Sequence, residues 1–182
     1  MAATLTIMHN IDHIQRMLAD AKARLNDADI LAQSLNCASD SQALLRILAL
    51  EVLLKTAQFI CNGNYKYNHK YVDFWLELPE YARTQIIEIA ELEYPERTDF
   101  SDIEKLLRAY EFVFTKARYY FELYKNYTLA EQQELGEYWV EIGAPNDEAE
   151  VQYFPMELTA LTTGIITFIE NAITSLQTQS NQ

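Results

Sequence analysis

The feature that most constrains the fold is the segment of residues 43–60, ALLRILALEVLLKTAQFI, which is apolar on nearly every side of a helix. One narrow polar line interrupts it, formed at helical spacing by Glu51, Lys55, Gln58 and Asn62. A helix that is hydrophobic all round is covered by neighbouring elements. The Glu51/Lys55 pair is therefore either a small solvent window or the wall of an internal cleft. His69, which follows the turn at residues 62–64, can face the same space.

Length and composition favour a single helical domain. The chain has 182 residues, of which 49% are hydrophobic and 12% aromatic, enough for a sizeable core. Only four Gly and four Pro are present, few for a sheet-rich fold with many tight turns. The sequence therefore predicts an all-α fold, a single up-and-down bundle of five or six helices over residues 1–182.

Apolar periodicity and capping residues place the helices along the chain. The expected helical segments are residues 11–35, 42–62, 101–124, 128–140 and 155–176, with two short helices over residues 71–92 that bend at Leu78 and Pro79. Capping boxes are predicted at Ser39 with Gln42 and at Ser101 with Glu104, and Thr128 is predicted to cap the helix that follows it. The acidic residues 143–150 are expected to form an exposed loop, and residues 177–182 a frayed end.

Charge disfavours several classes of partner. The formal net charge of −13 disfavours RNA, and neither DNA nor an anionic membrane is expected as a partner. The longest apolar stretch is interrupted by charged residues well before the roughly 20 residues of a membrane span. Two cysteines and an N-terminus without signal-peptide features predict a cytoplasmic protein. No metal site or cofactor is predicted.

One segment of this acidic chain combines basic and aromatic side chains. It contains Tyr65, Lys66, Tyr67, His69, Lys70 and Tyr71. Such a mixture can stack bases and neutralise phosphates, or its tyrosines can pack as lids over the core. Arg118 has two interpretations as well, because it lies on a helix line of alternating charges that ends at Glu122. That line is either a solvated stripe or the setting of a phosphate-binding arginine.

These candidates combine into one predicted site. Glu51, Lys55 and Arg118 are expected to face a common polar cleft between the helices at residues 42–62 and 101–124. A buried carboxylate needs a nearby cation, so Glu51 should pair with at least one of the two basic side chains. His69 should stand at the mouth of the cleft, where Tyr67 or Tyr71 can cover a bound ring.

No complete nucleotide-binding or hydrolase motif is present. Three segments in order, LLRILALEVLLKTAQF, NHKYVDFWLEL and FTKARYYFE, resemble helices of the HEPN domain, and FPMELTALTTGIITFI resembles the helix that often follows them. HEPN domains are small helical modules of bacterial toxin-antitoxin and defence systems. The resemblance implies a HEPN-like core at about residues 10–176.

Many HEPN domains are metal-independent RNases that use an arginine followed four to six residues later by a histidine. Arg118 matches that arginine, but residues 119–125 contain no histidine. The expectation is therefore a homodimeric, non-catalytic binding module without catalytic residues, which engages a protein partner or a nucleotide-like ligand. The alternatives are an RNase that uses Arg118 with His69 or Glu122, and a purely structural scaffold.

Overall fold

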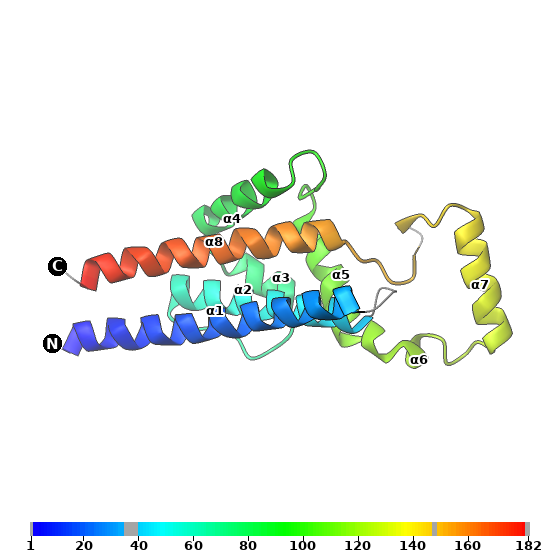
Figure 1. Cartoon of the computed structure of the whole chain (residues 1–182), viewed down its shortest axis with the longest axis horizontal. Coiled ribbons are helices and arrows are strands. Elements are labelled where there is room, and N and C mark those ends of the chain that lie inside the picture. The colour runs from blue at the N-terminus through cyan, green and yellow to red at the C-terminus, as the bar shows by residue number, and fades with distance from the viewer. Residues whose placement is uncertain (1, 35–39, 147–148, 181–182) are drawn as a thin grey trace.

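The computed structural model describes residues 2–34, 40–146 and 149–180, which fold into eight α-helices and one short 3-10 helix (Figure 1). The helices are α1 (Ala2–Ser34), α2 (Asp40–Asn62), α3 (Tyr71–Leu76), α4 (Glu80–Glu93), α5 (Ile103–Thr115), α6 (Tyr120–Leu123), α7 (Leu129–Glu141) and α8 (Pro155–Ser180), and the 3-10 helix η1 is Ala117–Tyr119. The all-α class is confirmed. The described helices outnumber the five or six predicted.

The long helices α1, α2 and α8 lie alongside one another and enclose the core (Figure 1). The heptad-like seam of α1 is buried at Ile14, Leu18, Ala21 and Ala28. The two alanines allow the backbone of a neighbouring helix to approach closely, because they add little side-chain volume. The apolar run of α2 is buried as its sequence requires, and the core includes positions such as Leu161 of α8.

Small residues also set the packing of α4 on α8. Gly164 of α8 lies so close to α4 that a Cβ atom at this position would collide with the carbonyl oxygen of Ile86 and lie 3.2 Å from the Cβ of Ala90. Ala82 and Ala90 of α4 are fully buried. The close approach of the two backbones thus depends on the missing side chain of Gly164.

The turns around α3 follow the sequence prediction. Helix α2 ends at Asn62, and Gly63 adopts a φ of +75°, with its N–H donating to the carbonyl of Phe59 at 2.9 Å. A left-handed glycine of this kind ends many helices. Pro79 occupies the N-cap position of α4, so the predicted bend between two short helices is confirmed.

The helix predicted over residues 101–124 is wrong in its second half. Helix α5 ends at Thr115, and η1 and α6 follow as separate short helices. The Thr115 hydroxyl donates to the carbonyl of Glu111, a bond that often bends a helix. Beyond this break Phe121 is 69% exposed, although it would lie on the apolar face of an unbroken helix. The predicted cap is also wrong, because Asp102 rather than Ser101 caps α5 by accepting from the Lys105 N–H.

The other predicted boundaries have mixed outcomes. The Thr128 cap is confirmed, and Glu131 completes a capping box. Helix α1 begins at Ala2, earlier than expected, and α8 continues to Ser180 through residues predicted to fray. Ser39 of the other predicted capping box lies outside the described residues, as do residues 147–148 of the acidic loop.

Helix α7 is set apart from the other long helices. It contains no buried residue and lies beyond one end of the bundle (Figure 1), so it adds nothing to the core. The expected bundle is therefore wrong for this segment. Along the described stretches of the chain, no helix combines the length and apolar character needed to cross a membrane.

Candidate functional site

The predicted site is organised by the carboxylate of Glu51 in α2, whose side chain is only 6% exposed. Lys55, one turn later, places its Nζ 2.8 Å from Oε1. The Nδ1 atom of His69 lies 2.8 Å from Oε2, and the Tyr71 hydroxyl donates to the same oxygen at 3.1 Å. The predicted pairing of Glu51 with a cation is confirmed. We call Glu51, Lys55, His69 and Tyr71 the Glu51 cluster.

The rest of the polar line on α2 joins α3 to the bundle. Gln58 donates to the Phe74 carbonyl at 3.3 Å and to the Glu77 carboxylate at 2.7 Å, and Asn62 donates to the Glu77 carbonyl at 3.2 Å. The Lys55 ammonium lies 5.3 Å from the centre of the Phe74 ring. A helix as short as α3 is not stable alone. The polar line is therefore neither a solvent window nor the wall of an open cleft, but a seam between α2 and α3.

Tyr71 is fully buried within this seam, which corrects the expectation that it can cover a bound ring. Burial, and then the negative charge of Glu51, raise the pKa of the Tyr71 hydroxyl far above its usual range, while the positive charge of Arg118 opposes this rise. The hydroxyl therefore stays protonated and acts as a donor to Glu51. The Tyr71 backbone N–H donates to the Glu111 carboxylate at 3.1 Å, which anchors the start of α3 on α5.

His69 connects the buried carboxylate to the surface. Its side chain is 58% exposed, although its Nδ1 atom is bonded to Glu51. The imidazole ring also lies 5.4 Å from the ring of Phe114 on α5. Because Nδ1 is used in the bond to Glu51, Nε2 is the ring nitrogen that can meet a ligand.

Arg118 also lies against the ring of Phe114. Its guanidinium carbon lies 5.0 Å from the centre of the Phe114 ring and 4.9 Å from that of Tyr119. Arg118 belongs to η1 and is exposed, so the break after α5 determines where its side chain stands. His69 and Arg118, 49 positions apart in the sequence, are thus neighbours of one ring. We call the exposed surface formed by His69, Phe114 and Arg118 the His69–Arg118 face.

Two predicted site residues have other neighbours. The Tyr67 side chain is 89% exposed, and its ring lies 5.2 Å from that of Tyr65, which in turn stacks with His13 at 6.3 Å. Glu122 in α6 is exposed and forms an ion pair with Lys125 at 3.3 Å. These contacts of Tyr67 and Glu122 do not include a residue of the Glu51 cluster.

Sequence reasoning missed two residues that complete this region, Glu111 and Phe114. Glu111 lies at helical spacing on the same charged line as Arg118, which is typical of a solvated position, and Phe114 lies on the apolar face of its helix. Helical periodicity shows which side of α5 each residue occupies. It does not show that α3 begins against that helix, so the sequence carried no signal for their contacts with Tyr71 and His69.

Comparisons with protein-family models, with curated proteins and with solved structures found no match to this chain. Within residues 2–34, 40–146 and 149–180, no three His, Cys, Asp or Glu side chains are grouped so that they could hold a metal ion.

Proposed function

We propose that this protein is a HEPN-like, non-catalytic binding module that takes an anionic, nucleotide-like ligand at the His69–Arg118 face. The observation that carries the proposal is the shared Phe114 ring, against which the imidazole and the guanidinium both lie while exposed to solvent. His69 lies in the loop before α3 and Arg118 lies in η1, so the fold brings the two groups together.

The chemistry of this face suits a small phosphorylated ligand. A guanidinium presents donors in a fork that matches phosphate oxygens, and an imidazole nitrogen supplies a further hydrogen bond. The exposed ring of Tyr119 beside Arg118 offers a flat surface on which a base can stack. A net charge of −13 repels long polyanions, so a ligand with few phosphates is favoured over an extended RNA.

The same cluster offers little for RNA cleavage. Attack through a ribose 2′-OH requires groups that accept and donate protons near neutral pH. Tyr71 retains its proton because its pKa is raised, and Lys55 and Glu51 are paired with each other and nearly buried. Among the four residues of the Glu51 cluster, this leaves His69 as the single exposed group that can transfer a proton, whereas cleavage needs both an acceptor and a donor. These features support binding rather than catalysis.

One observation favours the alternative function of a metal-independent RNase. The hydrogen bond that His69 Nδ1 donates to Glu51 orients the imidazole ring, as a carboxylate orients the histidine of a catalytic dyad. Arg118 stands beside the same Phe114 ring, where it can stabilise negative charge. In this alternative, His69 takes the role of the histidine that is absent after Arg118.

We also propose that the protein forms a homodimer, as HEPN-like modules commonly do. Phe121, three residues after Arg118, is exposed, and burial of its ring against a second copy would bring the two His69–Arg118 faces near the dimer seam. A role in a toxin-antitoxin or defence system follows from the HEPN resemblance. Light scattering tests the dimer, and a monomeric mass at every protein concentration contradicts it.

Titration calorimetry with ADP, with adenosine as the uncharged control, tests the binding function. We expect ADP to bind and adenosine to bind much more weakly. His69→Ala and Arg118→Ala should each weaken ADP binding at least about tenfold, the loss expected when a charge-assisted contact is removed. The matched control Arg108→Ala removes another exposed arginine, which is paired with Glu104, and should change binding little.

Three results would contradict this proposal. ADP affinity that is unchanged in both His69→Ala and Arg118→Ala would place the ligand elsewhere. Cleavage of single-stranded RNA that is lost in either variant would establish the RNase alternative. A wild-type protein that binds neither ADP nor inorganic phosphate would support the purely structural scaffold.

A further inference from the structure

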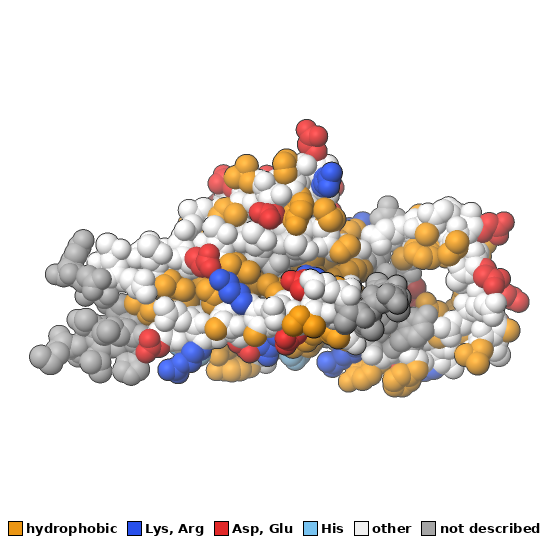
Figure 2. All heavy atoms as spheres, viewed as in Figure 1, with side chains coloured by type: hydrophobic (Ala, Val, Ile, Leu, Met, Phe, Trp, Pro, Cys, Tyr) orange, Lys and Arg blue, Asp and Glu red, His pale blue; other side chains and the backbone are white. Residues whose placement is uncertain are grey.

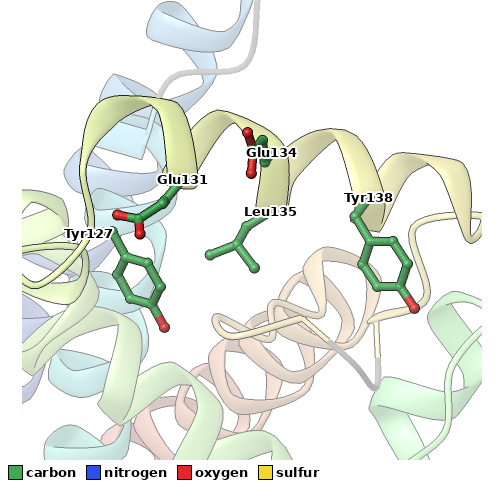
Figure 3. Close-up of a pocket in the computed structure, with 5 residues that line it drawn as sticks. All are labelled: Tyr127, Glu131, Glu134, Leu135 and Tyr138. Carbon is green, nitrogen blue, oxygen red and sulfur yellow. The ribbon is translucent and has the colours of Figure 1, made fainter.

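Helix α7 carries an unpartnered apolar surface. Its exposed side chains include Leu129, Leu135, Tyr138 and Val140, and Leu129 and Val140 are 86% and 65% exposed. Figure 3 shows Tyr127, Leu135 and Tyr138 extending to the same side of the chain, where they line a shallow depression together with Glu131 and Glu134. In Figure 2, hydrophobic side chains lie on the surface at the right of the molecule, where Figure 1 labels α7.

The helix has few of the features that stabilise a helix in isolation, namely its capping box and a hydrogen bond from Gln133 to Glu137. It has 13 residues, near the lower limit for stability in water, and Gly136 in its interior is less favourable in a helix than alanine. Its four glutamates stand three or four positions apart, at 131, 134, 137 and 141, so their charges repel one another along the helix. The capping box at Thr128 supports the first turn only.

The sequence after Lys125 offers no compensating cation. From residue 126 to residue 182 the chain contains nine Asp and Glu residues and no Lys, Arg or His. Apolar side chains bordered by carboxylates therefore face solvent on an element that the bundle does not cover. A partner that supplies both apolar area and positive charge would remove both sources of instability.

We propose that the surface formed by Tyr127 and by Glu131, Glu134, Leu135 and Tyr138 of α7 binds a basic, amphipathic segment of another protein. Leucine-like side chains of that segment would cover Leu135 and Tyr138, and its Lys or Arg side chains would meet the glutamates. A second copy is disfavoured, because two α7 helices would bring like charges together. RNA and anionic membranes are disfavoured for the same reason.

The test uses the full chain and a synthetic helical peptide with leucine on one face and lysine on the other. A second peptide with glutamate in place of lysine is the control. Trp139 of α7, whose Nε1 donates to the Pro145 carbonyl, reports binding by fluorescence, while the other tryptophan, Trp75, is buried in the core. We expect the lysine peptide to bind and to slow amide exchange in α7, and the glutamate peptide not to bind.

Matched charge variants distinguish binding of the peptide at the α7 surface from general attraction of a basic peptide to an acidic protein. Glu134→Lys with Glu137→Lys should weaken binding of the lysine peptide at least about tenfold. Glu88→Lys with Glu91→Lys makes the same change in net charge, at the same spacing, on exposed positions of α4, and should weaken it less than about twofold. Equal weakening by the two double variants would overturn the proposal.

Apolar variants provide a second test that leaves charge unchanged. Leu135→Ser with Tyr138→Ser should abolish binding of the lysine peptide, whereas Leu92→Ser with Tyr81→Ser, at exposed positions of α4, should not. A wild-type dimer that becomes monomeric in the α7 variants would identify a second copy as the occupant and overturn the proposal. None of the α7 variants should change ADP binding, because this inference does not rest on the His69–Arg118 face.

Discussion

The seam between α2 and α3 differs from the helix α7 in whether its side chains find partners within the chain. In the seam, the Glu51 carboxylate has three partners within the chain, and Gln58 and Asn62 bond to α3. In α7, the apolar side chains are exposed and the glutamates have no cation along the following sequence. The first region is closed around its own polar groups, and the second is the surface for which we propose a partner.

This contrast shows that polar residues in an apolar helix can mark a contact within the fold, whereas apolar residues in a polar helix can mark a surface that the fold leaves uncovered. The polar line on α2 looks functional in the sequence, but most of it holds the short helix α3 in place. The α7 sequence looks like an ordinary amphipathic helix, yet nothing in the described bundle covers it. The predictions below test this difference from the largest expected effect to the smallest.

The largest effect is expected from removal of the Glu51 carboxylate. Glu51→Ala leaves Lys55 and the Tyr71 hydroxyl without their acceptor in a nearly buried position and should lower the free energy of unfolding by about 3–5 kcal/mol. Leu135→Ala in α7 should change it by less than about 0.5 kcal/mol. Urea denaturation of both variants measures the difference. A loss below about 1 kcal/mol for Glu51→Ala would mean that the seam is not a stabilising network.

A smaller effect with a defined pH dependence is expected at Tyr71. Tyr71→Phe removes the hydrogen bond to Glu51 and should cost about 1.5–3 kcal/mol at neutral pH. In the folded wild type the pKa of Tyr71 is raised above its value in the unfolded chain, mainly by burial. Above pH about 10 the unfolded chain loses this proton and the folded chain keeps it, so stability falls as pH rises.

Denaturation at several alkaline pH values checks the sign of this effect. The wild type should lose roughly 1 kcal/mol more per pH unit than Tyr71→Phe in this range. Tyr110, which is also buried with a raised pKa and donates to the Phe154 carbonyl, contributes equally to both proteins and cancels in the comparison. Parallel pH profiles of the two proteins would show that the Tyr71 hydroxyl is accessible to solvent.

The smallest effects are expected from one substitution made in two helices. Gly164→Ala places a Cβ atom against the backbone of Ile86 and should destabilise the fold by about 1–3 kcal/mol. Gly136→Ala in α7 meets open space and should instead raise the helical stability of that segment by about 0.5–1 kcal/mol. Thermal denaturation reports the first change, and circular dichroism reports the second. Effects of the same sign would contradict the packing described for these helices.

The sequence could predict those parts of the structure that depend on local spacing. The burial of α2, the pairing of Glu51 with Lys55 one turn later, the bend at Pro79 and the cap at Thr128 all follow from residues close together in the chain. The approach of His69 to Glu51 was also expected, because a short turn at Gly63 returns the chain toward α2.

Contacts between distant segments could not be predicted from the same patterns. Periodicity continued the helix of α5 through Lys116, whereas the structure bends there and brings Arg118 to Phe114. The burial of Tyr71 depends on where α3 lies against α2 and α5. The residues next to Tyr71 in the sequence do not reveal that position. For α7, a pattern of apolar residues shows that a face should be covered, but it does not show what covers it.

Hydrogen exchange of the backbone amides in the unliganded, full-length protein tests the central contrast most directly. Amides of α2 around Glu51 should exchange only through global unfolding, because they belong to the closed core. Amides of α7 should exchange by local opening, at least about a hundredfold faster, because that helix has no buried residue. Equal protection of α2 and α7 would contradict the account, since it would show that α7 is held by the fold itself and needs no partner.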